Sequence, residues 1–282
     1  MTRVKESVMK CIFALCALMS IGAVIAICVF IFANGIPAIR EIGVWQFLSG
    51  RVWKPSVNIY GIFPMIIASL YVTAGAIIVG VAPGVLTAVF LLKYCPARLR
   101  KPMHTAINLL AGIPSIVYGF FALMVIVPLI GEVFYTGGKG ILTASLLLGI
   151  MILPTIINTA YSFLKAVPDM YFEGSLALGA TRERSIFFAM FPAASSGVLS
   201  GIILGVGRAI GETMAVVMVA GNQAVMPGSV LSGARTLTAN IVLEMSYAAG
   251  LHRGALVGTA VVLFVFILII NLCFSAIKQK KA

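Results

Sequence analysis

Stretches without a charged residue recur along this chain, and each is long enough to cross a membrane as a helix. One covers residues 11–33, and a longer one covers residues 55–92. A helix needs about 20 apolar residues to cross about 30 Å of hydrocarbon. Because 61% of the chain is hydrophobic and only 10% is charged, the composition excludes an ordinary soluble domain. The sequence predicts an all-α integral membrane protein.

The apolar stretches predict six transmembrane helices. We expect them over residues 11–33, 65–92, 105–130, 141–164, 197–219 and 254–277. Residues 1–60 then form one helix and an extracytoplasmic loop, in which Trp45 and Trp53 are suited to anchor the membrane interface. Residues 61–282 form the core of the protein.

The short connections between these helices differ in basic charge. Most of the 20 Lys and Arg residues lie at the two termini and in the connections after the second and fourth helices. Because positively charged connections resist translocation, we expect these segments and both termini in the cytoplasm. Topology and contact with anionic lipid then explain the net charge of +12, and no nucleic-acid partner is predicted.

The fifth expected helix carries two charges on a face that also carries glycines. At 100° per residue, Arg208 and Glu212 share an arc of about 80° with Gly197, Gly201 and Gly205. The glycines predict close approach of a neighbouring helix, and charges four residues apart can neutralise each other. Two interpretations follow: a structural ion pair that fixes helix packing, or an anion-handling or gating pair in a translocation path.

A polar segment, residues 168–192, separates the fourth and fifth helices. Asp169 favours a helix start and Gly179 favours its end. Thr181 can cap a second short helix that ends near Phe191. Two short helices joined by a turn form a rigid projection on the cytoplasmic face. An amphipathic connector at the membrane interface has a similar pattern.

Several enzyme classes lack the residues they need here. The glycine-rich run at 137–139 has Val133 where a phosphate-binding loop needs glycine, so the chain is not predicted to hydrolyse ATP. The two histidines, His104 and His252, fall on opposite sides of the membrane in the expected topology, and they therefore cannot share a metal ion. We predict no catalytic residue, no metal site and no cofactor bound by this chain.

The polar segment resembles a known motif. Glu173, Gly179 and Pro192 match in register the EAA loop of ABC importer permeases, although Gly174 and Ser175 replace its two alanines. The chain is also similar to permease subunits of ABC phosphate importers, of the PstC type, over residues 113–119, 176–181 and 207–222.

This resemblance implies a type I ABC importer permease fold and a second, homologous permease as partner. It implies that the coupling segment 168–192, with Glu173, Gly179 and Pro192, docks on a cytoplasmic ATPase dimer, which uses the ATP. It also implies an extracytoplasmic phosphate-binding protein that delivers substrate, and a location in the bacterial inner (plasma) membrane.

Within this family, Arg208 and Glu212 become candidates for the translocation path or its gate. The expected function is import of inorganic phosphate. Another oxyanion, such as phosphonate, molybdate or sulfate, stays open as the substrate. A self-sufficient channel or a membrane scaffold is the alternative outside the family.

Overall fold

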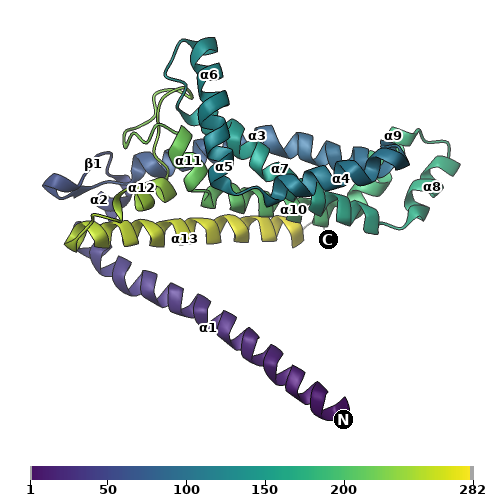
Figure 1. Ribbon diagram of the computed structural model, residues 1–282, viewed down its shortest axis with the longest axis horizontal. Helices are drawn as coiled ribbons and strands as arrows, with labels where there is room; N and C mark the ends of the chain where they lie inside the picture. The colour runs from purple at the N-terminus through teal and green to yellow at the C-terminus, as the bar shows by residue number, and fades with distance from the viewer. Residues whose placement is uncertain (1, 280–282) are drawn as a thin grey trace.

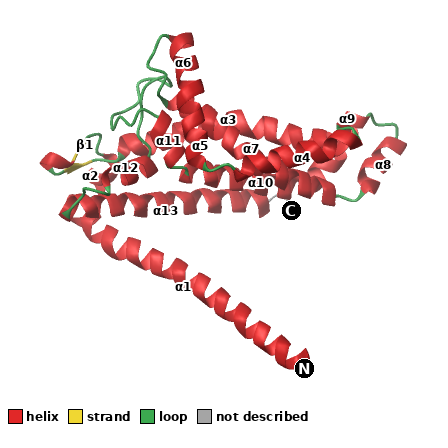
Figure 2. Ribbon diagram, in the orientation of Figure 1, coloured by secondary structure: helices red, strands yellow, loops and turns green. Residues whose placement is uncertain are grey.

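The computed structural model describes residues 2–279, which are helical apart from loops and one short hairpin (Figure 2). The long helices are α1 (Thr2–Ile42), α3 (Phe63–Val89), α7 (Ile141–Ala166), α10 (Phe191–Gly211) and α13 (Gly250–Gln279). The shorter helices are α2 (Val44–Ser49), α4 (Ala97–Gly112), α5 (Ser115–Phe121), α6 (Val127–Phe134), α8 (Asp169–Ala177), α9 (Arg182–Ser185), α11 (Met214–Val219) and α12 (Leu237–Glu244). Three π-helical turns extend helices: η2 (Phe90–Tyr94), η3 (Ala122–Ile126) and η4 (Ile186–Met190).

The hairpin lies between α2 and α3. Strand β1 (Trp53–Lys54) pairs antiparallel with β2 (Ile59–Tyr60), and Trp53 lies opposite Tyr60. A 3₁₀ turn, η1 (Pro55–Val57), joins the strands, and Asn58 after it adopts a left-handed conformation with φ 54°. Trp53 is buried while Trp45 is 81% exposed, so the prediction that both tryptophans are interfacial anchors is wrong for Trp53.

Within the described residues 2–279, six helical stretches are long and apolar enough to cross a membrane, which confirms the predicted number. Three of them contain the predicted residues: Glu6–Ile42, Phe63–Tyr94 and Ile141–Ala166. The sixth, Gly250–Cys273, contains the predicted residues up to 273, and α13 continues to Gln279. The all-α membrane architecture is therefore confirmed, and the third and fifth spans need correction.

A single third helix over residues 105–130 is wrong. Helix α4 ends at Gly112, and the span begins only with α5 and continues to Phe134. Ile113 between the two helices is extended, with φ −70° and ψ 127°. This is the conformation that steric clash with a following proline favours, and Pro114 follows.

The fifth span begins earlier than predicted. Helix α9, turn η4 and helix α10 form one stretch, Arg182–Gly211, so a separate short helix ending near Phe191 is wrong. Pro192 lies in the first turn of α10 and has no N–H to donate. The π turn immediately before it changes the backbone hydrogen-bond pattern, which lets the helix continue.

Helix α7 is the centre of the bundle, with α3 and α10 packed along it (Figure 1). A Cβ atom on Gly80 of α3 would lie 2.8 Å from the Gly149 carbonyl of α7. A Cβ atom on Gly201 of α10 would lie 2.9 Å from Thr159 Cβ. Both separations are too short for a real Cβ, so the helices approach closely because these positions are glycine. The predicted packing role of the glycines in α10 is confirmed.

Helix α1 diverges from the bundle and meets it only near its C-terminal end (Figure 1). There it packs on α13, where a Cβ on Gly254 would lie 2.7 Å from Ala38 Cβ and one on Gly258 would lie 2.9 Å from Ile39. Helices α1 and α13 run in opposite directions, so their outer ends both point toward the end of the molecule that carries α8 and α9 (Figure 1).

A buried carboxylate joins α12, α13 and the hairpin at the other end of the molecule. Glu244 is 7% exposed. Its Oε1 lies 2.5 Å from Arg235 Nη1, and its Oε2 lies 2.8 Å from His252 Nε2 and accepts a hydrogen bond from Trp53 Nε1 at 2.9 Å. Three side chains therefore meet at one carboxylate, and the contact with Trp53, which is distant in the sequence, fixes the hairpin to the bundle.

The environment of Glu244 favours its ionised form. Burial disfavours the charge, but hydrogen bonds from Trp53, His252 and Arg235, with the Arg235 charge, outweigh burial and hold the pKa below its ordinary value of 4.5. A carboxylate whose pKa is lowered by folding stabilises the folded state at pH values above its ordinary pKa. That stabilisation is lost as the pH falls toward the lowered pKa.

We expect Glu244→Gln to lower the stability of the folded protein by about 3–5 kcal/mol at pH 7, because Arg235 would lose a buried partner. The measurement is thermal inactivation of the detergent-solubilised protein. The difference in inactivation midpoint between the variant and the unaltered protein should shrink below about pH 4.5. Glu132→Gln, on the exposed surface of α6, is the control. Equal inactivation midpoints for the Glu244 variant and the unaltered protein would contradict a stabilising role for this carboxylate.

Candidate functional site

Arg208 lies in the last turn of α10, inside the fifth membrane span. Its side chain is partly buried, and Nη1 donates a hydrogen bond to Thr155 Oγ1 of α7 at 3.4 Å. Among the described residues, no carboxylate forms an ion pair with Arg208. A cation in a membrane span is costly unless something compensates it, so this arginine is chemically suited to an anion.

Glu212 does not pair with Arg208, and the predicted ion pair is wrong for the described structure. Glu212 has φ −67° and ψ 130°, so α10 ends before it and the projection of both residues onto one helix face does not apply. Its Oε1 accepts hydrogen bonds from the backbone N–H groups of Thr213 at 3.1 Å and Ala215 at 3.3 Å. The carboxylate therefore satisfies the free N–H groups at the start of α11.

Thr155, the partner of Arg208, belongs to a polar row on α7 that was not predicted from the sequence. Thr155 and Asn158 are one helical turn apart, and Ser162 and Lys165 continue the same spacing. This spacing places all four polar side chains on one face of a long apolar helix. A count of polar residues at three- and four-residue intervals in the fourth predicted helix would have detected them.

The coupling segment forms a compact turn between α7 and the fifth span. Gly179 ends α8 with φ 85°, a conformation that favours glycine. Thr181 Oγ1 then accepts a hydrogen bond from the Arg184 backbone N–H at 3.3 Å and caps α9. The Ser185 hydroxyl lies 3.0 Å from the Ser175 hydroxyl and joins α8 to α9. The structure therefore shows an ordered projection at this end of the bundle.

Side chains at the end of α3 attach this projection to the bundle. Lys93 Nζ lies 3.2 Å from Asp169 Oδ1 and 4.1 Å from the centre of the Phe172 ring. Arg182 donates a hydrogen bond to the Lys93 carbonyl and lies over the Tyr94 ring at 5.1 Å. Side-chain contacts therefore link the projection to the end of the α3–η2 stretch, in addition to its chain connections to α7 and α10.

The outer surface of the projection is unusually apolar. Met170 is 74% exposed and Leu178 is 91% exposed. Tyr171 and Leu176 are also exposed, and so is the Glu173 carboxylate beside them. An exposed apolar group with a charge at its side is typical of a protein interaction site.

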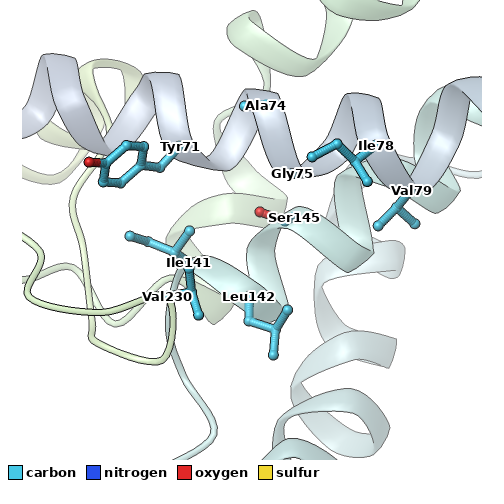
Figure 3. A pocket seen from close by; sticks show the side chains of 9 residues that line it. All are labelled: Tyr71, Ala74, Gly75, Ile78, Val79, Ile141, Leu142, Ser145 and Val230. Carbon is cyan, nitrogen blue, oxygen red and sulfur yellow. The ribbon is translucent and has the colours of Figure 1, made fainter.

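A hollow of about 380 Å³ between α3 and α7 is apolar and unsuited to an anion (Figure 3). Only Tyr71 and Ser145 bring polar side-chain atoms to it. The Ser145 hydroxyl donates to the Val72 carbonyl at 3.3 Å. Within residues 2–279, no group of three or more His, Cys, Asp or Glu side chains is arranged to hold a metal ion.

Comparison with known proteins identifies similar chains. The chain is 33% identical over 271 residues to the phosphate transport system permease protein PstC of Haemophilus influenzae, covering 86% of each chain. It is 37% identical over 243 residues to a probable ABC transporter permease protein, YqgH, of Bacillus subtilis, covering 84% of this chain and 79% of the relative.

A solved structure has the same fold. A chain of the MetNI methionine ABC transporter, in an inward-facing conformation, superposes with a TM-score of 0.63 at 18% identity. The match covers 82% of this chain and 100% of that chain. At this identity the similarity establishes the fold alone, and it confirms the expected type I importer permease fold.

A family match covers most of the chain. Residues 80–281 match the family described as binding-protein-dependent transport system inner membrane component. Together with the six apolar helices, this match identifies a multi-pass membrane protein. The chain therefore belongs to the family of inner membrane components of binding-protein-dependent transport systems.

Proposed function

We propose that this chain is a permease subunit that carries inorganic phosphate across the plasma membrane in an ATP-driven importer. The observation that supports it most is Arg208, an arginine inside a membrane span with no carboxylate paired to it among the described residues. A guanidinium group binds phosphate through charge-assisted hydrogen bonds. We choose phosphate among the oxyanions because several similar proteins are phosphate transport permeases of the PstC type.

Other subunits of the importer complete the translocation path. A second, homologous permease supplies the opposite wall, and an extracytoplasmic binding protein delivers phosphate. A cytoplasmic ATPase dimer supplies the energy and uses the ATP, while this chain has no catalytic site and binds no cofactor. The partly exposed position of Arg208 supports a path shared with a neighbour, because a cation facing lipid would be costly.

The coupling segment 168–192 docks on the ATPase, with Glu173 on its surface, Gly179 at its turn and Pro192 in the first turn of α10. The exposed Met170 and Leu178 support such a docking surface. This end of the molecule is then cytoplasmic, as are both termini. Residues 1–60 form a peripheral helix and loop, and residues 61–282 form the transporting core.

The direct test is uptake of labelled phosphate at low external concentration by cells with and without this chain. Loss of phosphate uptake in its absence is the expected result. Sulfate, molybdate and phosphonate are the competitors, and they should not displace phosphate. Unchanged phosphate uptake with loss of another oxyanion would overturn the substrate and leave the permease family in place.

Arg208→Gln is expected to reduce phosphate uptake on the order of 10- to 100-fold, because charge-assisted hydrogen bonds contribute about 1.5–3 kcal/mol. Uptake is measured alongside the amount of assembled complex in the membrane. Arg253→Gln, on the exposed surface of α13, is the matched control and should transport normally. Normal uptake by the Arg208 variant would remove this residue from the path. Disappearance of the variant from the membrane would instead favour a structural role.

Glu173→Lys is expected to reduce recovery of the ATPase with the permease, or to uncouple ATP hydrolysis from uptake, while membrane insertion is unchanged. The Glu173 carboxylate lies on the proposed docking surface, so reversing its charge would replace electrostatic attraction to the ATPase with repulsion. Co-purification and uptake per ATP hydrolysed are the measurements. Glu132→Lys, exposed on α6, is the control. Full coupling in the Glu173 variant would contradict docking through this residue.

A further inference from the structure

Two helices carry facing rows of polar side chains between Arg208 and the α8 end of the molecule. On α7 the row runs from Thr155 through Asn158 to Lys165. Ten residues of helix rise about 15 Å, which is about half the thickness of the hydrocarbon. On α4, His104 and Asn108 are four residues apart and lie on one face.

Hydrogen bonds connect the two rows. Asn158 Nδ2 donates to Asn108 Oδ1 at 2.9 Å, and Asn108 Nδ2 lies 3.1 Å from His104 Nδ1. The amide nitrogen is a donor, so Nδ1 of His104 accepts and the neutral ring keeps its proton on Nε2. We call Asn158, Asn108 and His104 the polar chain. It begins one turn from Thr155, the partner of Arg208.

The polar chain has unused hydrogen-bonding capacity. Asn158 Oδ1 is buried and has no partner among the described residues. A buried acceptor without a partner costs free energy, and lipid cannot satisfy it. The Asn108 side chain is on an exposed face. Both features are expected where a hydrated pathway, rather than lipid, adjoins the helices.

The polar chain ends at a basic hollow of about 380 Å³ between α4 and α7. Its lining includes His104, Tyr161 and three basic side chains, which are Arg100, Lys101 and Lys165. No acidic residue lines it, and none of the three cations belongs to an ion pair among the described residues. The Arg100 Nε is buried and has no partner there. The hollow therefore offers several donors and an uncompensated positive charge.

The two amine groups suit a site that binds weakly. Lys101 and Lys165 are exposed, so water and salt screen their charges. Arg100 is more constrained, because its Nη2 donates to the Leu92 and Cys95 carbonyls at 3.4 and 3.5 Å. Weak binding at the cytoplasmic side permits an ion to leave once it has arrived.

We propose that the basic hollow is a release site for the transported oxyanion, reached from Arg208 along the polar chain. The inference rests on the proposed function, because that function places Arg208 in the path and the hollow on the cytoplasmic side. It assigns Asn158 and Asn108 to the wall of the path, and it assigns Lys101 and Lys165 to the exit.

The test uses the complete importer reconstituted in liposomes, with phosphate as the probe. Asn158→Leu should lower phosphate uptake per ATP hydrolysed by about tenfold or more, because the path loses hydrogen bonds to a charged ion. Asn158→Gln, which keeps the amide, should recover part of the loss. Asn34→Leu on α1 is the matched control, since within residues 2–279 the Asn34 side chain bonds to the Phe30 carbonyl of its own helix.

The exit is tested by phosphate enclosed inside the liposomes, which should occupy the hollow and slow uptake. The double variant Lys101→Gln/Lys165→Gln should weaken this inhibition by about tenfold. Arg100 is left in place because it also holds backbone carbonyls. The double variant Lys54→Gln/Lys139→Gln removes the same charge from exposed positions elsewhere and should be inhibited normally.

The outcomes separate this inference from the proposed function. Uptake per ATP within twofold of normal in Asn158→Leu, or unchanged internal inhibition in the Lys101/Lys165 variant, would overturn the release site. A defect of the lysine variant that appears only in liposomes with anionic lipid would also overturn it, because a lipid headgroup would then be the ligand. If the importer carries a different oxyanion, phosphate is wrong as the substrate. The same measurements made with that oxyanion then test the release site.

Discussion

The close approach of α3 and α10 to α7 is the constraint on which the rest of the structure depends. In a membrane, lipid is as apolar as a leucine side chain, so helices associate through tight packing and polar contacts. Glycines provide the packing: Gly80 admits the Gly149 carbonyl, and Gly201 admits Thr159. The same approach brings Thr155 of α7 within hydrogen-bonding distance of Arg208 on α10. The position of the charged site therefore follows from the packing of small residues.

The residue at which a helix ends, rather than the helix face that carries a residue, determines which partners the charged side chains have. The chain becomes extended at Glu212, and its carboxylate bonds the backbone at the start of α11. This leaves Arg208 without the partner that an unbroken helix would provide. In contrast, Glu244 at the end of α12 has three polar partners. The Glu244 carboxylate therefore stabilises the fold, whereas Arg208, which has no ion pair among the described residues, keeps its charge to bind an anion.

The long helices were predictable because uninterrupted apolar segments leave few alternatives in a membrane. The end of α4 was also predictable, since Pro114 disfavours helix at Ile113. The break at Glu212 was not, because residues 207–213 contain no proline and have the spacing of a continuing helix. The cluster around Glu244 depends on Trp53, which is distant in the sequence. Such contacts arise from tertiary structure, and local patterns carry no signal for them.

The continuity of Arg182–Gly211 gives the proposed coupling a mechanical basis. The stretch begins in the projection that carries the exposed apolar surface and ends next to Arg208. Its 30 residues correspond to about 45 Å of helix, and no loop divides it. A turn at residues 178–181 separates α8 from this stretch, and the hydrogen bond between Ser185 and Ser175 joins the two. In the proposed coupling, tilting of the projection would tilt α10 against α7, where the Arg208–Thr155 contact lies.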